Sequence, residues 1–327
     1  MDDAAEPLIS VALCTYNGER YLRQQLDSLL AQTYSNMEVV AIDDASTDGT
    51  AELLREYASR DSRLRVFVNP RNLGFVRNFE RAITLCNGAL IAPCDQDDVW
   101  LRHKLRTLAN HIGEHSMAYC DSELIDAEGR SLGWRMSRIW AMQDLNDPAA
   151  LVLSNCVSGH AMLFRRELID GQPPLPADVF HDWWLAMRAA ARNGAVYCPE
   201  PLVRYRQHGK NVTNIMRRRQ SRSRMPGIPG SSMKRFEDTS KRLAHLAAVG
   251  DAHSPFFADF HRLWVSSERM WFAPRLAAFM WRHRRRLYPL RKKGRLSAVR
   301  KSLSHVFGLR LRRLFKPTKY GRVMAFV

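Results

Sequence analysis

Long apolar runs are absent from this 327-residue sequence, since charged or polar residues interrupt each hydrophobic stretch before the roughly 18 residues of a membrane-spanning helix. Met1–Pro7 is acidic and polar, so we also expect no secretory signal peptide. The six cysteines are scattered, without a Cys-x-x-Cys pair or a His/Cys cluster, unlike a zinc site or a disulfide framework. These absences predict buried thiols in a reducing compartment and a cytoplasmic protein, either soluble or attached to a surface.

Acidic residues are scarce at one end of the chain only. Residues 221–327 hold 5 Asp and Glu against 25 Lys and Arg, whereas residues 1–220 hold 28 against 25. The formal net charge of +17 therefore comes from the C-terminal part. This asymmetry predicts an anionic partner, a nucleic acid or a membrane surface, for the basic part alone.

The length allows one large domain with an extension. Residues 221–232 are rich in Ser, Arg, Pro and Gly, a composition typical of a linker. We therefore predict a first domain over residues 1–220, a linker over 221–232 and a basic, mainly helical extension over 233–327.

Short apolar runs alternate with segments of helical periodicity in the first domain. This alternation predicts an α/β fold with a mostly parallel, doubly wound sheet and right-handed crossovers. The predicted strands are 8–14, 37–42, 64–68 and one ending at 90–92, and the predicted helices are 19–32, 51–59 and 75–86.

Three acids, Asp95, Asp97 and Asp98, follow the strand that ends at 90–92. Ligands of open α/β sheets bind at the carboxyl ends of strands, and an Asp-x-Asp pair there can hold a hard divalent cation. Alternatively, Asp97 or Asp98 caps a helix that starts near Val99 and runs through Leu105 to Ala109. One acid suffices for a cap, so three acids favour the metal interpretation.

A second polar cluster, Asp43–Thr50, follows the strand at 37–42. Ser46 or Asp48 in this cluster could cap the next helix. The functional interpretation is a contact with the base or ribose of a nucleotide at the end of that strand.

Four segments, residues 10–18, 42–50, 72–74 and 95–100, resemble in order and spacing the family 2 glycosyltransferases with the GT-A fold, over about two thirds of the chain. Asp-Gln-Asp-Asp-x-Trp resembles the bacterial rhamnosyltransferase-like branch. The resemblance implies that residues 1–220 form a GT-A catalytic domain. It also implies these roles: Thr15 and Asn17 near the nucleotide, Asp43 or Asp44 on its base, Asp95 facing the ribose, and Asp97 on a divalent metal ion (Mg or Mn) at the diphosphate.

Such an enzyme needs a general base, because an attacking sugar hydroxyl must lose its proton. Asp182 lies at the start of a predicted helix, 185–191, where a carboxylate serves equally well as a cap. The resemblance implies that Asp182 is the base. Trp183 and Trp184 could offer an acceptor sugar a stacking surface, although buried aromatics are more often core.

His208 follows the last predicted strand of this domain, 203–206. The resemblance implies that His208 completes the metal site and that Arg204 and Lys210, with Arg206, neutralise the leaving diphosphate. The competing interpretation of His208 is a histidine in an exposed loop.

The C-terminal part has helical periodicity over 234–249, 256–272 and 280–290. In the third segment, Trp281, Leu287 and Tyr288 lie among Arg282 and Arg284–Arg286, a mixture that suits an anionic membrane surface. A solvated helical extension that packs on the catalytic domain is the alternative. Nucleic acid is a weaker candidate, since no recognition motif accompanies the charge.

Together these features predict an inverting, metal-dependent glycosyltransferase at the inner face of the cell membrane. By resemblance it would move rhamnose from a nucleotide-diphosphate donor to a hydroxyl of a cell-envelope glycan or lipid-linked acceptor. A non-catalytic nucleotide-sugar-binding module is the alternative, and it would need no base at Asp182. A nucleotidyltransferase would carry a Gly-rich phosphate loop, which residues 14–18 match poorly.

Overall fold

The computed structural model describes residues 6–209 and 231–290. The chain divides into two compact units, Met1–Asn214 and Ile215–Val327, which are described separately below. Lys210 and most of the predicted linker at 221–232 lie outside the described residues. The domain boundary at residue 220 stays a prediction.

Four strands of the first unit are parallel neighbours in the order β3-β2-β1-β4. Every residue of β1, β2 and β4 is buried, as expected for parallel strands with both faces covered. The predicted strands and helices of this region are confirmed, and no boundary is shifted by more than two residues. The elements are β1 (Ile9–Thr15), α1 (Glu19–Leu30), β2 (Met37–Asp43), α2 (Thr50–Ala58), β3 (Leu64–Val68), α3 (Phe75–Leu85) and β4 (Leu90–Cys94).

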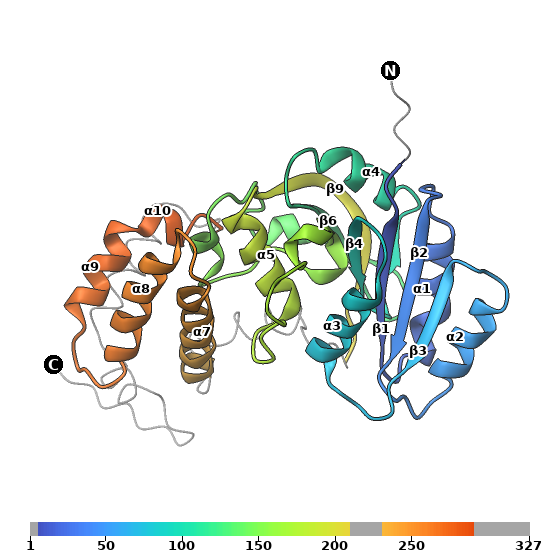
Figure 1. Cartoon of the computed structure of the whole chain (residues 1–327), viewed down its shortest axis with the longest axis horizontal. Coiled ribbons are helices and arrows are strands. Elements are labelled where there is room, and N and C mark those ends of the chain that lie inside the picture. The colour runs from blue at the N-terminus through green and yellow to red at the C-terminus, as the bar shows by residue number, and fades with distance from the viewer. Residues whose placement is uncertain (1–5, 210–230, 291–327) are drawn as a thin grey trace. The chain divides into compact units, whose positions relative to one another are not determined.

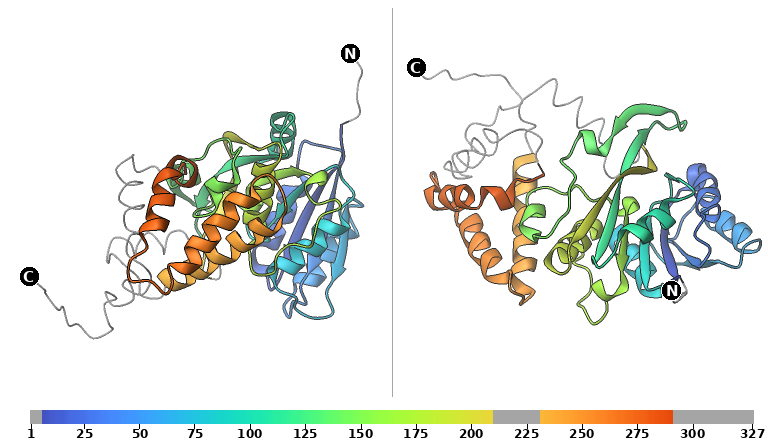
Figure 2. Two further views of the ribbon diagram at one scale, coloured as in Figure 1. Left: turned by 60° about the vertical axis from the view of Figure 1, so that its left-hand side comes forward. Right: turned by 90° about the horizontal axis from the view of Figure 1, so that it is seen from above.

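The winding of the sheet reverses between β1 and β4. From β1 the chain steps to β2 and β3 on one side, and α3 then carries it back to β4 on the other side of β1. Right-handed crossovers place α1 and α2 on one face and α3 on the opposite face, as Figures 1 and 2 show. The loops after β1 and β4 therefore lie at the switch point, where ligands of doubly wound sheets bind.

The rest of the sheet is mixed. Strand β8 (Met162–Arg165) is antiparallel to both β4 and β6 (Met117–Ile125), and β6 is parallel to β9 (Ala195–Arg206). Strand β7 (Ser131–Arg135) pairs antiparallel with β6. The predicted α/β fold is confirmed, with parallel pairing confined to the four strands above and to β6 with β9. The remaining helices of this unit are α4 (Lys104–His111), α5 (His181–Ala191) and the short 3₁₀ helices η1 (Met136–Arg138), η2 (Pro148–Leu151), η3 (Gly159–Ala161) and η4 (Arg166–Leu168).

The helix predicted to start near Val99 is wrong in its first residues. Val99 and Trp100 form the short strand β5, which pairs antiparallel with Arg204 and Val203 of β9. The helix α4 begins only at Lys104, and its N-cap residue is His103. Asp97 and Asp98 therefore cap no helix, and the capping alternative for these acids is excluded.

Apolar side chains from the helices and strands of the first unit form one continuous core. All six cysteines are buried and unpaired, so the prediction of buried thiols is confirmed. Leu22, Leu26 and Leu29 recur at helical spacing on α1, which buries one face of this helix. This core fixes the strand ends that carry the polar loops.

The second unit contains α7 (Ser231–Ala248), α8 (Ser254–Ser266), α9 (Pro274–Arg282) and α10 (Arg284–Leu287). Figures 1 and 2 show α7 and α8 side by side, and the Trp264 indole packs on the Phe236 ring with centroids 5.3 Å apart. The predicted helical character is confirmed for residues 231–290, although the third predicted helix is divided between α9 and α10. No helix among the described residues is long and apolar enough to cross a membrane.

Two residues of the predicted membrane-facing stretch point inward. Leu287 and Tyr288 are buried in the helical unit, so they offer no apolar surface to a membrane. Trp281 is exposed, and the Arg284 guanidinium lies 4.5 Å from its ring centroid. Other exposed apolar side chains of this unit are Val249, Val265, Met270, Trp271 and Phe272.

Candidate active site

Hydrogen bonds join the loops that follow β1 and β4. The Tyr16 amide donates to Gln96 Oε1 at 2.7 Å, and Gln96 Nε2 donates to the Tyr16 carbonyl at 3.0 Å. A Cβ at position 18 would lie 2.1 Å from Gln96 Oε1, so only glycine fits there while Gln96 keeps this position. Two motifs 80 residues apart in the sequence therefore form a single rim at the switch point of the sheet.

Three of the residues predicted to bind the donor lie in a hydrogen-bonded network at this rim. The Thr15 hydroxyl donates to Asp43 Oδ1 at 2.9 Å, and the Ser46 amide donates to Asp43 Oδ2 at 2.9 Å. Asn17 has a φ of 48°, and its side-chain oxygen accepts a hydrogen bond from the Thr47 amide. A left-handed non-glycine residue is strained, and such strain concentrates at functional sites. The network fixes the loops before any ligand binds.

Asp44, the fourth predicted donor ligand, organises the next loop. Its carboxylate accepts hydrogen bonds from the Leu73 amide at 2.8 Å, the Gly74 amide at 2.9 Å and Asn69 Nδ2 at 2.6 Å. These bonds hold the Asn72–Gly74 motif at the start of α3. In this structure Asp44 binds protein groups, and a contact with a nucleotide base remains a prediction.

Asp97 and His208 meet although 111 residues separate them, and their shared role at a metal ion stays a prediction. His208 Nε2 lies 2.7 Å from Asp97 Oδ2. The buried Arg206 holds the acidic loop against the end of β9, since its Nε donates to the Asp97 carbonyl at 2.7 Å and its amide to Asp98 Oδ1 at 2.9 Å. Tyr21 covers this corner, with the His208 ring centroid 5.0 Å and the Arg206 guanidinium 4.8 Å from its own ring centroid.

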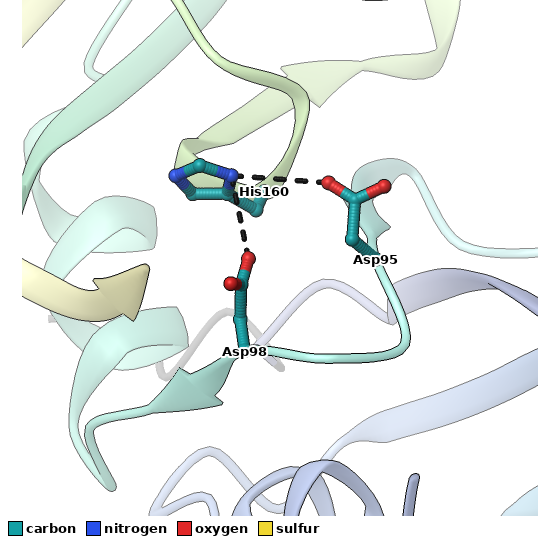
Figure 3. Close-up of side chains that lie close together, drawn as sticks. All are labelled: Asp95, Asp98 and His160. Carbon is teal, nitrogen blue, oxygen red and sulfur yellow. Dashed lines mark ion pairs between the residues drawn. The ribbon is translucent and has the colours of Figure 1, made fainter. Parts of the chain in front are cut away.

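The structure adds a second acidic cluster that the sequence did not predict. His160 Nδ1 lies 3.4 Å from Asp98 Oδ2 and 3.8 Å from Asp95 Oδ2, as Figure 3 shows. His160 Nε2 lies 3.1 Å from the Ser122 hydroxyl. The ligand atoms of Asp95, Asp98 and His160 all lie within 4.8 Å of one another, close enough to share a cation. The missed signal was the histidine of the segment Ser158-Gly159-His160.

Burial and charge affect the two carboxyls of this cluster differently. Burial raises the pKa of Asp98 well above its usual value, and the charges of Asp97 and Asp95 raise it further. Burial also acts to raise the pKa of Asp95, but the hydrogen bond and charge of His160 outweigh it and lower the pKa. Asp98 Oδ2 is buried without a hydrogen-bond partner among the described residues. A carboxylate oxygen in this position is stabilised by binding a proton or by a nearby cation.

A carboxylate and imidazole set of this kind suits a divalent metal ion. Carboxylate oxygens suit Mg and Mn, and an imidazole nitrogen is a common ligand of transition metals. The structure offers two separate sets, the predicted pair of Asp97 and His208 and the cluster of Asp95, Asp98 and His160. Asp98 and His160 are buried, whereas Asp97 and His208 are partly exposed.

Asp182 is the second residue of α5, and Phe180 is the N-cap residue of this helix. Its carboxylate accepts a hydrogen bond from the Trp183 amide at 2.6 Å. Burial raises the pKa of Asp182 to about 7, and the charge of Asp95 raises it while amide hydrogen bonds lower it. A carboxyl whose pKa is near neutral is suited to general base catalysis, and it is close enough to the acidic loop to interact with Asp95.

The neighbours of Asp182 are less exposed than the sequence suggested. Trp184 is only 6% exposed, and the partly buried Trp183 donates its indole Nε1–H to the Leu151 carbonyl at 2.6 Å. His181 is buried against Phe79, with ring centroids 3.9 Å apart, and burial lowers the pKa of His181 to about 4. An acceptor role for Trp183 and Trp184 stays a prediction, and the packing of Trp184 disfavours it.

Of the two residues predicted to neutralise the diphosphate, the structure describes only Arg204. Arg204 lies on β9 between Val99 of β5 and Glu123 of β6, and it is exposed. Lys210 lies outside the described residues. Lys104, which the sequence did not single out, is buried near the acids with its Nζ 2.8 Å from the Trp100 ring centroid. Burial lowers the pKa of Lys104 to about 7, against the charges of Asp98 and Asp95, which raise it.

Comparison with known proteins agrees with this arrangement. Residues 10–171 match the model of glycosyl transferase family 2. An uncharacterized glycosyltransferase of Haemophilus influenzae is 28% identical over 229 residues, which cover 66% of this chain and 70% of the relative. An uncharacterized protein of Mycobacterium tuberculosis H37Rv is 30% identical over 218 residues, covering 62% of this chain and 60% of the relative.

A solved structure supports the fold. The crystal structure of residues 1–349 of Staphylococcus aureus TarS in complex with UDP-GlcNAc matches with a TM-score of 0.56 and 18% identity, covering 86% of this chain and 81% of that 1–349 chain. A GT-A sheet with acids at its switch point is the architecture of a nucleotide-sugar-dependent glycosyltransferase. The match of residues 10–171 to glycosyl transferase family 2, together with the relatives named as glycosyltransferases, identifies the chain as a glycosyltransferase.

Proposed function

We propose that this glycosyltransferase moves a sugar from a nucleotide-diphosphate donor to a hydroxyl of a cell-envelope glycan or lipid-linked acceptor, with inversion at the anomeric carbon. The observation that carries the proposal is Asp182, a carboxyl of near-neutral pKa that interacts electrostatically with Asp95 at the switch point. Asp182 would take the proton of the acceptor hydroxyl as that oxygen attacks from the face opposite the leaving diphosphate. A single displacement of this kind inverts the configuration.

The donor is proposed to lie along the rim made by the loops after β1, β2 and β4. Thr15, Asn17, Asp43 and Asp44 would line the nucleotide side, and Asp95 the ribose. Arg204 and Lys210 would face the diphosphate, whose charge suits guanidinium and ammonium groups. Rhamnose is the proposed sugar on the resemblance of Asp95–Trp100 alone.

Asp97 and His208 are proposed to hold the metal ion, Mg or Mn. Support comes from their 2.7 Å approach and partial exposure, because a cation that also binds diphosphate needs open coordination positions. When bound, the metal would act as a Lewis acid on the departing diphosphate. The cluster of Asp98 and His160 would orient the loop from beneath.

The acceptor class is proposed from relatives and from charge. A Bacillus subtilis relative, 32% identical over 114 residues, is described as a putative teichuronic acid biosynthesis glycosyltransferase. That alignment covers 45% of the relative, so it supports only a broad class of envelope glycan. The basic C-terminal unit is proposed to hold the enzyme at the anionic inner face of the cell membrane, with Trp281 and the exposed Met270–Phe272 as its apolar contacts.

A panel of nucleotide sugars tests the proposal. Binding and slow hydrolysis of dTDP-rhamnose, UDP-GlcNAc and GDP-mannose would be measured by calorimetry and nucleotide release, with and without Mn or Mg. We expect one donor to bind at least about tenfold more tightly than the others, a difference of about 1.4 kcal/mol, and only with metal. Equal, metal-independent binding of all three would contradict the proposed donor site.

A further inference from the structure

Two phenylalanine rings are exposed together beside the candidate base. Phe75 and Phe180 are each 42% exposed, and their ring centroids lie 5.1 Å apart at an interplanar angle of 31°. Phe75 is the first residue of α3, and Phe180 immediately precedes α5. Large apolar side chains that remain exposed side by side often mark a binding surface.

The elements that build the active site also hold this pair in place. On one side, Asp44 accepts hydrogen bonds from the amides of Leu73 and Gly74 and so fixes the backbone that leads into Phe75. On the other side, the His181 ring stacks on Phe79 and lies edge-on to Phe75 at 6.5 Å. The exposed rings therefore lie between a residue assigned to the donor side and the residue assigned as base.

The pair has the chemistry of a sugar-binding platform. One face of a pyranose ring presents C–H groups, which pack on an aromatic ring, while the hydroxyls at the edge stay hydrated. Partial exposure suits such a ligand, because only one face of the sugar loses contact with water. A charged ligand would need a basic partner, and none of the ring contacts of Phe75 or Phe180 in the described part of the chain involves Lys or Arg.

We propose that Phe75 and Phe180 form the acceptor subsite and that the unit bound there is a pyranose, packed by its apolar face on the two rings. This proposal rests on the proposed function, since it assumes that Asp182 activates the acceptor hydroxyl. Phe180 is the N-cap residue of α5, so a sugar packed on its ring would be held at the start of the helix that carries Asp182. The sequence predicts the acceptor role for Trp183 and Trp184. In the structure, the exposed aromatic surface is instead formed by Phe180, just before α5, and by Phe75 of α3.

Saturation-transfer NMR of the full chain tests the subsite without a known acceptor. The probes are methyl glycosides of rhamnose, glucose, galactose and N-acetylglucosamine. With the wild type, we expect saturation on the ring C–H protons of at least one glycoside. Phe75→Ala and Phe180→Ala should each weaken its binding roughly 3- to 10-fold, the size of a single aromatic contact. Phe75→Trp and Phe180→Trp should retain the binding.

A matched control and a second readout separate the possible failures. Val68→Ala removes an equally exposed apolar side chain from the end of β3 and should change nothing. Nucleotide-diphosphate affinity, measured on the same samples, should be unchanged in every variant. Glycoside signals that are absent, or equal in the wild type and both Ala variants, would overturn the subsite.

A parallel loss of nucleotide affinity in the Ala variants would also overturn the subsite, because the rings would then belong to the donor. A wild type that binds no nucleotide diphosphate at all, with or without metal, would instead refute the proposed function itself. The two failures are therefore distinguishable in one set of samples.

Discussion

Replacing Asp182 with Asn tests the assignment of the general base through both rate and stability. The amide keeps the size of the side chain and can still accept the hydrogen bond from the Trp183 amide, so the start of α5 should be retained. Loss of a positioned base typically costs about 10²- to 10⁴-fold in rate. We expect transfer to fall by that factor while nucleotide-sugar affinity is unchanged.

The pH dependence of transfer gives a sharper readout. Because the pKa of Asp182 is raised to about 7, the wild type should gain activity as the pH rises through 7 and the carboxyl ionises. Asp182→Asn removes this carboxyl, so the remaining activity should no longer increase as the pH rises through 7. Asp170→Asn, at an exposed carboxyl of the same unit, is the matched control and should preserve both the rate and the profile.

Stability should change in the opposite direction to activity. A carboxyl with a folded-state pKa of about 7 and an unfolded-state pKa of about 4 binds more protons in the folded state between these pH values. The free energy of unfolding therefore falls as the pH rises from 4 to 7, by at most about 4 kcal/mol and by less after solvent screening. Asp182→Asn should make the protein more stable at pH 8.

Urea unfolding at pH 5 and pH 8 measures this difference between the wild type and Asp182→Asn. Near-wild-type transfer by the Asn variant would return Asp182 to a structural role at the helix terminus. A variant that is inactive but less stable at pH 8 than the wild type would show that the carboxylate stabilises the fold, contrary to the reasoning from burial.

Three further predictions concern other parts of the chain. Asp97→Ala should abolish the metal-dependent gain in nucleotide affinity measured by calorimetry, whereas His160→Ala should keep it; the reverse pattern would move the metal to the cluster in Figure 3. Arg206→Met should lower the free energy of unfolding in urea by about 3–5 kcal/mol, because it leaves buried carbonyls and Gln24 Oε1 without their donor; a change below about 1 kcal/mol would contradict this. The full chain should co-sediment with vesicles that contain anionic phosphatidylglycerol, and high salt should weaken this binding, whereas neutral phosphatidylcholine vesicles should not bind it. A chain ending at Gln220 should stay in the supernatant yet bind nucleotide. Equal sedimentation of the truncated protein would exclude the basic unit as the anchor.

Local sequence patterns were sufficient to predict the strands and helices of the first half of the sheet. Apolar runs followed by turn residues and helical periodicity identify βα units because each unit buries its own apolar face against the next. The acids at 95, 97 and 98 could be placed at the carboxyl end of a buried strand for the same reason, whereas the switch point itself is known only from the strand order of the structure. The pairing of Asp97 with His208 needed the family resemblance as well.

Features that depend on long-range pairing could not be predicted. Val99 and Trp100 become a strand only because β9, over a hundred residues later, pairs with them. His160 reaches the acids because β8 inserts antiparallel between β4 and β6, and no local pattern specifies this order. Likewise, Trp184 is buried and Phe180 exposed for reasons of packing around α5 that residue type alone does not reveal.

Several polar groups near the acids are buried at a cost in stability. Asp98 Oδ2, Lys104 Nζ and both ring nitrogens of His181 are buried without hydrogen-bond partners among the described residues. Each such group costs stability, and a core evolved for stability alone would replace them with apolar side chains. Their burial also excludes water from beneath the acidic loop. In the resulting low dielectric, the charges of the acidic loop act more strongly than they would in water, which would favour the proposed transfer of a sugar from an anionic diphosphate.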